Sequence, residues 1–498
     1  MFVHFNTRIL IGINFSSLLI KVSEQMDVPG QRLSLFAEVW LKAGADPALQ
    51  HLIKFGHKIQ FEDGIPPLTL PLTEHETVMP DPQMNIVRSE VAQLLAKEAV
   101  RKVSREEAAS KPGHYSHIFT VPKPGGKHRV VINMKPLNEH VLKEKFRMET
   151  TKDVRSILKK GDFGAVVDLT DAYYTVKLNK QSRKYCRFIV DGQIYEYIAL
   201  PMGLTCSARI FTRVALFIGS RLRRMGVRII LYIDDLLIIT ASAQLCKEHV
   251  ILVVNTLLTF GFLLNEKKSN LTPSQLFVYL GMVWDTVNWL LSIKQEREDN
   301  IRRNAQELTK ATAATCRTVS VFLGRTNSAA GAIPLARARC RVLQWDFLAS
   351  CTAPHLYNSH MVITPAAKSE LEFWANLPAG LSSPITLGTA SGTLTTDASE
   401  EGLGILYNGH LISEQIPLQF QPFHINVKEL CVLDRFLDLF PEVRDSVITW
   451  RVDNNAALSC IRNEGSTKSW ELCVLSCSIL TRCQARNINL DPVRISSK

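Results

Sequence analysis

The stretch Ile229-Ile230-Leu231-Tyr232-Ile233-Asp234-Asp235-Leu236-Leu237-Ile238-Ile239-Thr240 places two adjacent carboxylates inside an otherwise apolar run. Burying one isolated carboxylate is costly, and two neighbouring carboxylates repel each other. The alternative interpretation is a solvated hairpin turn, because aspartate is common in turns. The flanking Tyr232, Ile233 and Leu236 are not usual turn formers. The run therefore predicts two β-rich halves that meet at Asp234 and Asp235, with cations neutralising the pair.

A third carboxylate ends an earlier predicted strand, Ala165-Val166-Val167-Asp168. Two-metal phosphoryl transfer needs carboxylates from different strands to hold two metal ions about 3.5–4 Å apart. Oxygen-rich ligands suit Mg²⁺. The three aspartates Asp168, Asp234 and Asp235 are therefore predicted to bind two Mg²⁺ ions.

Six segments between about residues 120 and 285 resemble the motifs of reverse transcriptases, and they occur in the same order. The upstream segment Val121-Pro122-Lys123-Pro124-Gly125-Gly126-Lys127-His128-Arg129 and the residues after it resemble the fingers hairpin. The remaining five are Asp168–Tyr174, Leu200–Leu204, Tyr232–Asp235, Gly261–Lys268 and Tyr279–Val283, which resemble the first to fourth catalytic motifs and the primer-grip hairpin.

This resemblance implies a role for each matching residue. Asp168, Asp234 and Asp235 would be the catalytic metal ligands. Tyr173 would be the bulky gate that excludes a 2′-hydroxyl, although a core tyrosine is the alternative. Lys123 and Arg129 would hold the triphosphate by adding positive charge where negative charge develops, although a solvated basic hairpin is the alternative.

Two further nucleotide-site expectations come from the second and fourth motifs. Met202 and Gly203 would line the nucleotide site, with Met202 standing where retroviral enzymes usually carry glutamine. A thioether cannot make the hydrogen bonds of an amide, so activity is expected to be kept while fidelity and nucleotide preference stay open. Lys268, or its neighbour Lys267, would donate a proton to pyrophosphate; an exposed lysine without a role is the alternative.

The C-terminal part of the chain carries a second set of acids. Asp397 follows a predicted strand Leu394–Thr396, Glu429 lies in a predicted helix Val427–Leu439, and Asp453 ends a predicted strand Val447–Val452. The set resembles RNase H, particularly the form fused to retrotransposon reverse transcriptases, in which acidic ligands hold two metals that activate water. Turn aspartates and a solvated helix glutamate are the alternatives.

The fourth acid of that family has no clear counterpart. The segment Ile488-Asn489-Leu490 resembles the strand that precedes it, but Asp491 comes too early for the family pattern. We therefore expect a domain cut just before its last ligand, with RNase H cleavage left uncertain.

Bulk composition fits a globular protein that binds nucleic acid. The 498 residues carry a formal net charge of +11, and a basic surplus favours polyanionic partners, with membranes as the weaker alternative. The 11 cysteines show no CxxC pair, which indicates a reducing compartment. No signal peptide or membrane-spanning run is evident. The sequence therefore predicts an intracellular protein of the cytoplasm or nucleus, neither secreted nor membrane-bound; it leaves the oligomeric state open.

The fold class expected is α+β: a right-hand polymerase of fingers, palm and thumb, followed by an RNase H-like α/β domain. Helix is predicted over Met84–Val103 and a strand over Phe277–Trp284. The expected domains are an N-terminal extension and linker (1–84), fingers and palm (85–285), a helical thumb and connection (286–385), and a truncated RNase H-like domain (386–498). Within the first, Gly30–Leu33 and Phe36–Trp40 loosely resemble the region before the polymerase in DIRS-type elements.

The expected function is that of a retrotransposon enzyme of the DIRS or Gypsy kind. It would be an RNA-directed DNA polymerase that takes an RNA template, a DNA primer and deoxynucleoside triphosphates, and that binds RNA–DNA hybrids. The alternative is a catalytically decayed remnant of a mobile element that still binds nucleic acid.

Overall fold

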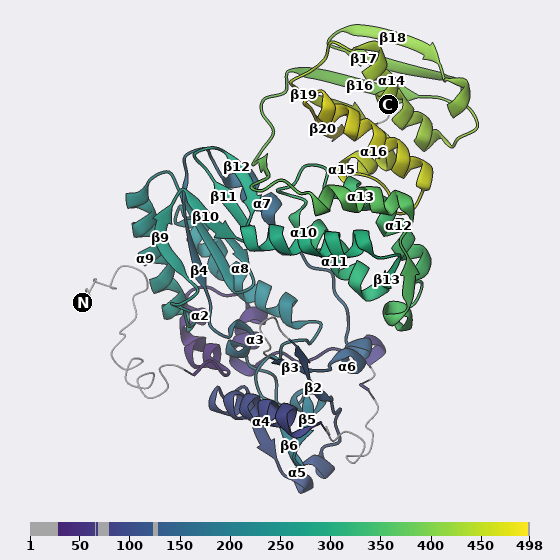
Figure 1. Cartoon of the computed structure of the whole chain (residues 1–498). Coiled ribbons are helices and arrows are strands. Elements are labelled where there is room, and N and C mark those ends of the chain that lie inside the picture. The colour runs from purple at the N-terminus through teal and green to yellow at the C-terminus, as the bar shows by residue number, and fades with distance from the viewer. Residues whose placement is uncertain (1–27, 65, 68–78, 123–127, 497–498) are drawn as a thin grey trace. The chain divides into compact units, whose positions relative to one another are not determined.

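The computed structural model describes residues 28–64, 66–67, 79–122 and 128–496. The chain divides into two compact units, with the boundary between Gln275 and Leu276. Each unit has its own sheets and helices (Figure 1). The predicted residue Lys123 lies outside the described residues.

A four-stranded antiparallel sheet forms the centre of the first unit. Its strand order is β7-β8-β4-β9, with the bounds β4 Phe163–Asp168, β7 Arg228–Tyr232, β8 Asp235–Thr240 and β9 Asn270–Ser274. Helices α8 (Ser207–Arg224) and α9 (Ala243–Thr259) pack against it. Strands β4 and β8 are almost entirely buried, which explains their continuous apolar sequence. The two predicted β-rich halves are confirmed as β7 and β8.

The first unit contains a second group of elements. Its helices are α4 (Asp81–Ala96), α5 (Arg105–Ser110), α6 (Lys135–His140) and α7 (Thr151–Ile157). A three-stranded sheet has the order β1 (Val100–Val103), β6 (Gln193–Tyr197) and β5 (Arg187–Val190), and a two-stranded sheet pairs β2 (Ile118–Pro122) with β3 (His128–Ile132). The helix predicted over Met84–Val103 is wrong at its end. The chain leaves the helix through Glu98, whose φ is 51°, and Val100–Val103 pairs with β6 as a strand.

Residues 28–64, predicted to be an extension, belong to the core of the first unit. They form η3 (Arg32–Phe36), α2 (Ala37–Lys42), α3 (Pro47–Phe55) and η4 (Glu62–Gly64). Trp40 is fully buried. Its ring packs edge-on against Phe260 with centroids 5.0 Å apart, and its indole N–H donates to the Phe260 carbonyl over 3.1 Å.

The second unit begins with a four-stranded sheet, β10-β11-β12-β15. Its strands are Leu276–Tyr279, Met282–Asp285, Leu290–Ile293 and Ser382–Pro384. The single strand predicted over Phe277–Trp284 is wrong, because the chain turns at Leu280 and Gly281, both with positive φ. Four helices follow β12, together with the small β13-β14 sheet (Ala313–Thr315, His360–Val362): α10 Gln295–Lys310, α11 Cys316–Ala329, α12 Arg341–Ser350 and α13 Pro365–Ala375.

The last part of the second unit is a five-stranded mixed sheet with helices. Its order is β18-β17-β16-β19-β20, with β16 Gly392–Ala398, β17 Gly402–Tyr407, β18 His410–Gln415, β19 Ser446–Val452 and β20 Ile488–Arg494. Strands β16, β19 and β20 run parallel to one another, and β17 and β18 are antiparallel. Helices α14 (Ile425–Leu439), α15 (Asn455–Arg462) and α16 (Trp470–Ala485) bury its core.

Strand β20 lies at an edge of this sheet and contains a proline. Pro492 is paired with Trp450 of β19. Its carbonyl accepts a hydrogen bond of 2.6 Å from the Arg462 guanidinium. Proline cannot donate to a strand ladder and is therefore restricted to edge strands.

Within the described residues, no helix is long and apolar enough to cross a membrane.

The buried position of Trp40 predicts that the N-terminal segment stabilises the first unit. Trp40→Ala should lower the free energy of unfolding by about 3–5 kcal/mol, because it removes a buried aromatic side chain and leaves a cavity. Leu41→Ala is the matched control, since Leu41 is 55% exposed, and should change stability by less than about 0.5 kcal/mol. Urea unfolding followed by circular dichroism measures both; equal effects would contradict the core assignment.

Candidate active sites

The paired carboxylates lie at the tip of the β7–β8 hairpin. Tyr232 pairs with Asp235, so Ile233 and Asp234 form a two-residue turn. Ile233 has φ 54°, a left-handed conformation that is unusual for a β-branched residue and costs about 1–3 kcal/mol. The Leu169 N–H donates to the Asp234 carbonyl over 2.9 Å, which fastens the tip to the end of β4. Strain held by the surrounding structure is typical of functional sites.

Strand pairing brings the third aspartate to the same place. Asp168 is the last residue of β4, and its Cα partner across the sheet is Asp235. The Asp168 main chain is fixed on its other side, since its N–H donates to Ser269 Oγ over 3.0 Å and its carbonyl accepts from the Asn265 N–H over 2.8 Å. The three predicted metal ligands therefore lie together.

The electrostatics of this cluster fit a cation. Burial, reinforced by Asp234 and Asp168, raises the pKa of Asp235 to about 6. Burial also raises the pKa of Asp168, against the opposing effect of Lys268. The Oδ1 atom of Asp168 is buried without a hydrogen-bond partner among the described residues, and the Lys268 ammonium lies 4.0 Å from it. A buried carboxylate oxygen without a donor suits a metal ligand.

Tyr173 lies beside these aspartates on the short helix η6 (Ala172–Thr175). Its ring packs edge-on against Phe211 with centroids 5.8 Å apart. Burial, with a contribution from Asp234, raises the pKa of its hydroxyl. The half-buried ring is thus held on one side by the core and lies within electrostatic reach of the carboxylates.

A cleft of about 490 Å³ contains three of the predicted nucleotide-site residues, Arg129, Met202 and Gly203. Arg129 is exposed on β3, and Met202 is 42% exposed. Gly203 has φ 91°, a conformation that favours glycine. Asn138 fixes this loop, since its side-chain amide donates to the Gly203 carbonyl and its oxygen accepts from the Thr205 N–H, both over 2.8 Å.

The second acidic set is assembled by parallel strands. Gly392 to Thr395 of β16 pair with Ile448 to Arg451 of β19, and the same offset places Asp397 beside Asp453. Glu429 approaches from α14. One oxygen from each of Asp397, Glu429 and Asp453 lies within 4.8 Å of the others, an arrangement that could hold a metal ion.

Glu429 is the buried member of this triad. Burial, followed by repulsion from Asp397 and Asp453, raises its pKa to about 8. Its Oε2 atom is buried and lacks a hydrogen-bond partner among the described residues. Because the repulsion comes from two other carboxylates, a cation between the three would relieve it.

Asp491 does not join this triad. It pairs with Thr449, near the middle of β19, whereas Asp453 follows the end of that strand. The structure therefore places Asp491 away from the carboxyl end of the sheet, as its early position in the sequence indicated.

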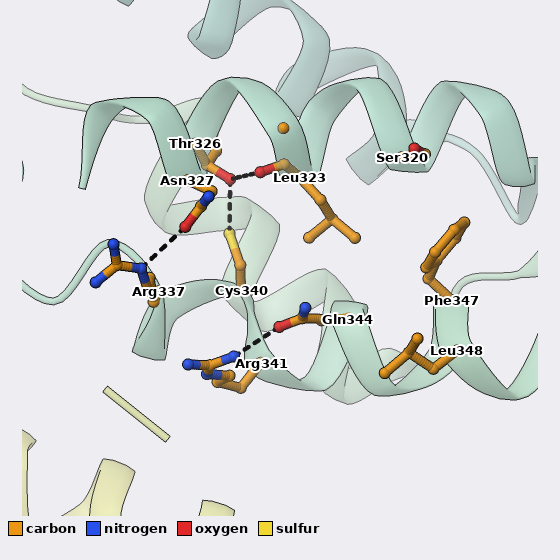
Figure 2. Close-up of a pocket in the computed structure, with 11 residues that line it drawn as sticks. Ser320, Leu323, Thr326, Asn327, Arg337, Cys340, Arg341, Gln344, Phe347 and Leu348 are labelled. Atoms are coloured by element: carbon orange, nitrogen blue, oxygen red, sulfur yellow. Dashed lines mark hydrogen bonds between the residues drawn. The ribbon is translucent and has the colours of Figure 1, made fainter. Parts of the chain in front are cut away.

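A further cavity of about 300 Å³ lies between α11 and α12 and contains none of the predicted site residues. Figure 2 shows hydrogen bonds between three pairs of its polar side chains: Arg337 to Asn327 over 2.9 Å, Arg341 to Gln344 over 2.8 Å, and the Cys340 thiol to Thr326 over 3.4 Å.

Several supporting residues could not be found from the sequence. Asn138 and Ser269 act on the site by hydrogen bonds to its backbone groups, and no spacing pattern marks them. Asn265 lies within the fourth motif, but the resemblance gave it no role. The sequence did offer a signal for Asn454, because this residue directly follows the predicted site residue Asp453. It caps α15 by accepting from the Ala456 and Ala457 N–H groups, and its amide donates to Asn426 Oδ1 over 2.9 Å.

Solved structures similar to this chain share its fold. A foamy viral protease-reverse transcriptase in complex with double-stranded DNA superimposes with a TM-score of 0.54 at 16% identity, covering 93% of this chain and 82% of that one. The same kind of protein in complex with an RNA/DNA hybrid gives 0.54 over 92% of this chain and 62% of that one. The fold is thus the polymerase fold of reverse transcriptases followed by an RNase H fold, as expected from the sequence.

Sequence comparisons agree. Residues 121–284 match the family described as reverse transcriptase (RNA-dependent DNA polymerase). The Pol polyprotein of transposon gypsy from Drosophila melanogaster is 26% identical over 206 residues, which is 40% of this chain and 19% of that protein. The Tf2-3 transposon polyprotein of Schizosaccharomyces pombe is 24% identical over 198 residues, 40% and 14% of the two chains. The aligned part thus spans less than a fifth of each of these relatives. Residues 121–284 therefore match the reverse transcriptase family, and this part of the chain is similar to the polyproteins of retrotransposons.

Proposed function

We propose that this chain is an RNA-directed DNA polymerase that adds deoxynucleotides to the 3′ end of a DNA primer on an RNA template. The observation that carries the proposal is the pairing of Asp168 with Asp235 across β4 and β8, with Asp234 at the adjoining turn. Three carboxylates gathered at one end of neighbouring strands are what two-metal nucleotidyl transfer requires.

Asp168, Asp234 and Asp235 would hold two Mg²⁺ ions, and the supporting observation is the buried Asp168 Oδ1 atom, which has no hydrogen bond among the described residues. When bound, such ions supply acidity at the attacking 3′-hydroxyl and charge neutralisation at the triphosphate. The protein supplies the positions of the ligands, through Ser269 and Asn265 at Asp168 and through the Leu169 N–H at Asp234.

The surrounding side chains would bind and select the nucleotide. Arg129, with Lys123 from the same hairpin, would hold the triphosphate, and Lys268 would donate a proton to the leaving pyrophosphate. Tyr173 would close the space that a ribose 2′-hydroxyl needs. Met202 offers packing without hydrogen bonds at the same cleft. Binding of the template and primer through their backbones should weaken steeply with salt.

A second activity is supported by the triad Asp397, Glu429 and Asp453. We infer that these residues bind metal and cleave the RNA strand of an RNA–DNA hybrid, as RNase H enzymes do. The mutual approach of the three carboxylates and the buried Glu429 oxygen support metal binding. Asp491 is not part of the set, because it pairs with Thr449 near the middle of β19.

The alternative function is a decayed remnant that binds nucleic acid without catalysis. The polymerase carboxylates argue against it. The strained Ile233 turn and the buried Asp168 each cost folding free energy. Without selection for catalysis, mutations that remove them would therefore accumulate early. Both are present.

Primer extension tests the polymerase. With poly(rA)/oligo(dT), Mg²⁺ and dTTP, the wild-type chain should extend the primer, and Asp234→Asn should reduce extension more than about a hundredfold because a metal ligand is lost. Binding of the primer–template should be retained. Asp63→Asn is the control, since Asp63 is an exposed aspartate. A wild-type chain that is folded and binds primer–template but never extends it would support the remnant instead.

Metal binding tests the second site independently of catalysis. In an Asp234→Asn background, Mn²⁺ titration followed by electron paramagnetic resonance should report ions bound at the triad. Adding Glu429→Gln should abolish that binding, because it removes the central negative ligand. Glu442→Gln, the same change at an exposed position, should preserve it. Equal Mn²⁺ binding in all three variants would rule out a metal at the triad.

Hybrid cleavage tests the second activity. A labelled RNA strand annealed to DNA should be cut by the wild-type chain, and Asp397→Asn should abolish the cut while leaving primer extension at its normal rate, because the two acid clusters lie in different units. Cleavage that survives in Asp397→Asn would show that another site, or a contaminating nuclease, is responsible.

A further inference from the structure

The segment of residues 28–36, here called the strap, touches two parts of the first unit that flank the nucleotide site. The Gly30 N–H donates to the carbonyl of Lys97, just after α4, over 2.9 Å. The neighbouring Gln31 N–H donates to the carbonyl of Tyr174 over 2.8 Å. Consecutive residues of the strap therefore connect the end of α4 to the turn that carries Tyr173.

The strap fits its place closely. A Cβ added to Gly30 would lie 2.2 Å from the Glu98 carbonyl oxygen and 2.5 Å from that of Lys97. These are backbone atoms, so a larger residue requires the strap or the α4 end to move. The Gln31 side chain is also engaged, since its oxygen accepts from the Arg183 guanidinium over 3.0 Å.

The turn Asp171–Tyr174 is held from the opposite end by an ion pair. The Lys97 ammonium lies 3.1 Å from Asp171 Oδ1, and the two side chains are 34% and 18% exposed. Asp171 has φ 48°, a left-handed conformation that a non-glycine residue keeps only when its surroundings hold it. Lys97 thus supports the turn through its side chain at Asp171 and, by way of Gly30 and Gln31, through its carbonyl at Tyr174.

Tyr173 lies between these two fixed points. Its backbone position follows from Asp171 on one side and Tyr174 on the other, while Phe211 limits its ring on the inner face. A small displacement of the turn would move the ring relative to the sugar of an incoming nucleotide, and displacements near 1 Å are enough to alter enzymatic rates strongly.

We propose that the strap and Lys97 are positioning elements for Tyr173, and that they set how strictly the polymerase rejects ribonucleotides. This inference rests on the proposed polymerase function and on the gate role of Tyr173. Gly30 acts by permitting the close approach, and Lys97 acts by holding Asp171.

The experiment compares the kcat/KM for dTTP with that for UTP on poly(rA)/oligo(dT). Gly30→Ala should lower this ratio about tenfold, and Lys97→Met about threefold, as expected for a partly exposed ion pair. The change should appear mainly as a lower KM for UTP, with kcat for dTTP little altered. Lys97→Arg, which keeps the charge, should restore the ratio.

Two controls separate positioning from general damage. Lys42→Met, at an exposed lysine of α2, and Gly324→Ala, where an added Cβ meets nothing within 4 Å, should leave the ratio unchanged. In a Tyr173→Ala background, Gly30→Ala and Lys97→Met should cause no further loss, because residues that act through one group are not additive.

The outcomes are distinct. The positioning role is overturned if Gly30→Ala and Lys97→Met both leave the dTTP-to-UTP ratio of kcat/KM unchanged. It is also overturned if they lower that ratio equally in the Tyr173→Ala background. In either case the polymerase proposal stands. If Gly30→Ala does not fold, Lys97→Met and its arginine counterpart decide. A wild-type chain that binds primer–template and incorporates neither nucleotide overturns the proposed function and this inference with it.

Discussion

Repulsion between buried carboxylates is the constraint on which both candidate sites depend. Bringing Asp168, Asp234 and Asp235 together raises the pKa of Asp235 to about 6, and bringing Asp397 and Asp453 to Glu429 raises the pKa of that residue to about 8. Such clusters destabilise a fold unless cations offset the repulsion. The chain meets this constraint twice, and in the first cluster main-chain hydrogen bonds hold Asp168 and Asp234 in place.

The two clusters are built by different kinds of strand pairing. In the first unit, antiparallel strands β4 and β8 place Asp168 opposite Asp235, and a strained hairpin adds Asp234. In the second, the carboxyl ends of the parallel strands β16 and β19 supply two acids, and a helix adds the third. Both arrangements put oxygen ligands at the end of a sheet, where backbone donors and solvent are accessible.

The sequence predicted those parts of the molecule whose residue pattern is local. The two strands that meet at Asp234 and Asp235 follow directly from the apolar run that these carboxylates interrupt. The apolar run Phe277–Trp284 alone predicted a single strand, whereas the resemblance of Tyr279–Val283 to the primer-grip hairpin indicated the turn that the structure has at Leu280 and Gly281. The helix expected to reach Val103 ends at Ala96, since pairing with β6 outweighs helical periodicity.

Long-range contacts account for what else the sequence did not reveal. Nothing near Trp40 indicates that its ring will meet Phe260, 220 residues away, so residues 28–64 read as an extension. Asn138 and Ser269 reach the first candidate site only through the folded chain. The roles expected for the site residues from the sequence remain predictions, whereas the close approach of Asp168, Asp234 and Asp235 is seen in the fold itself.

Pro492 has a consequence for how the molecule behaves in a crowded solution. An exposed edge strand is a template on which a strand of another chain can add, and that is a route to aggregation. In β20, Pro492 offers no N–H, and its carbonyl is already bonded to Arg462. The ladder that an incoming strand needs is therefore interrupted at this residue, which protects the edge of the five-stranded sheet from intermolecular pairing.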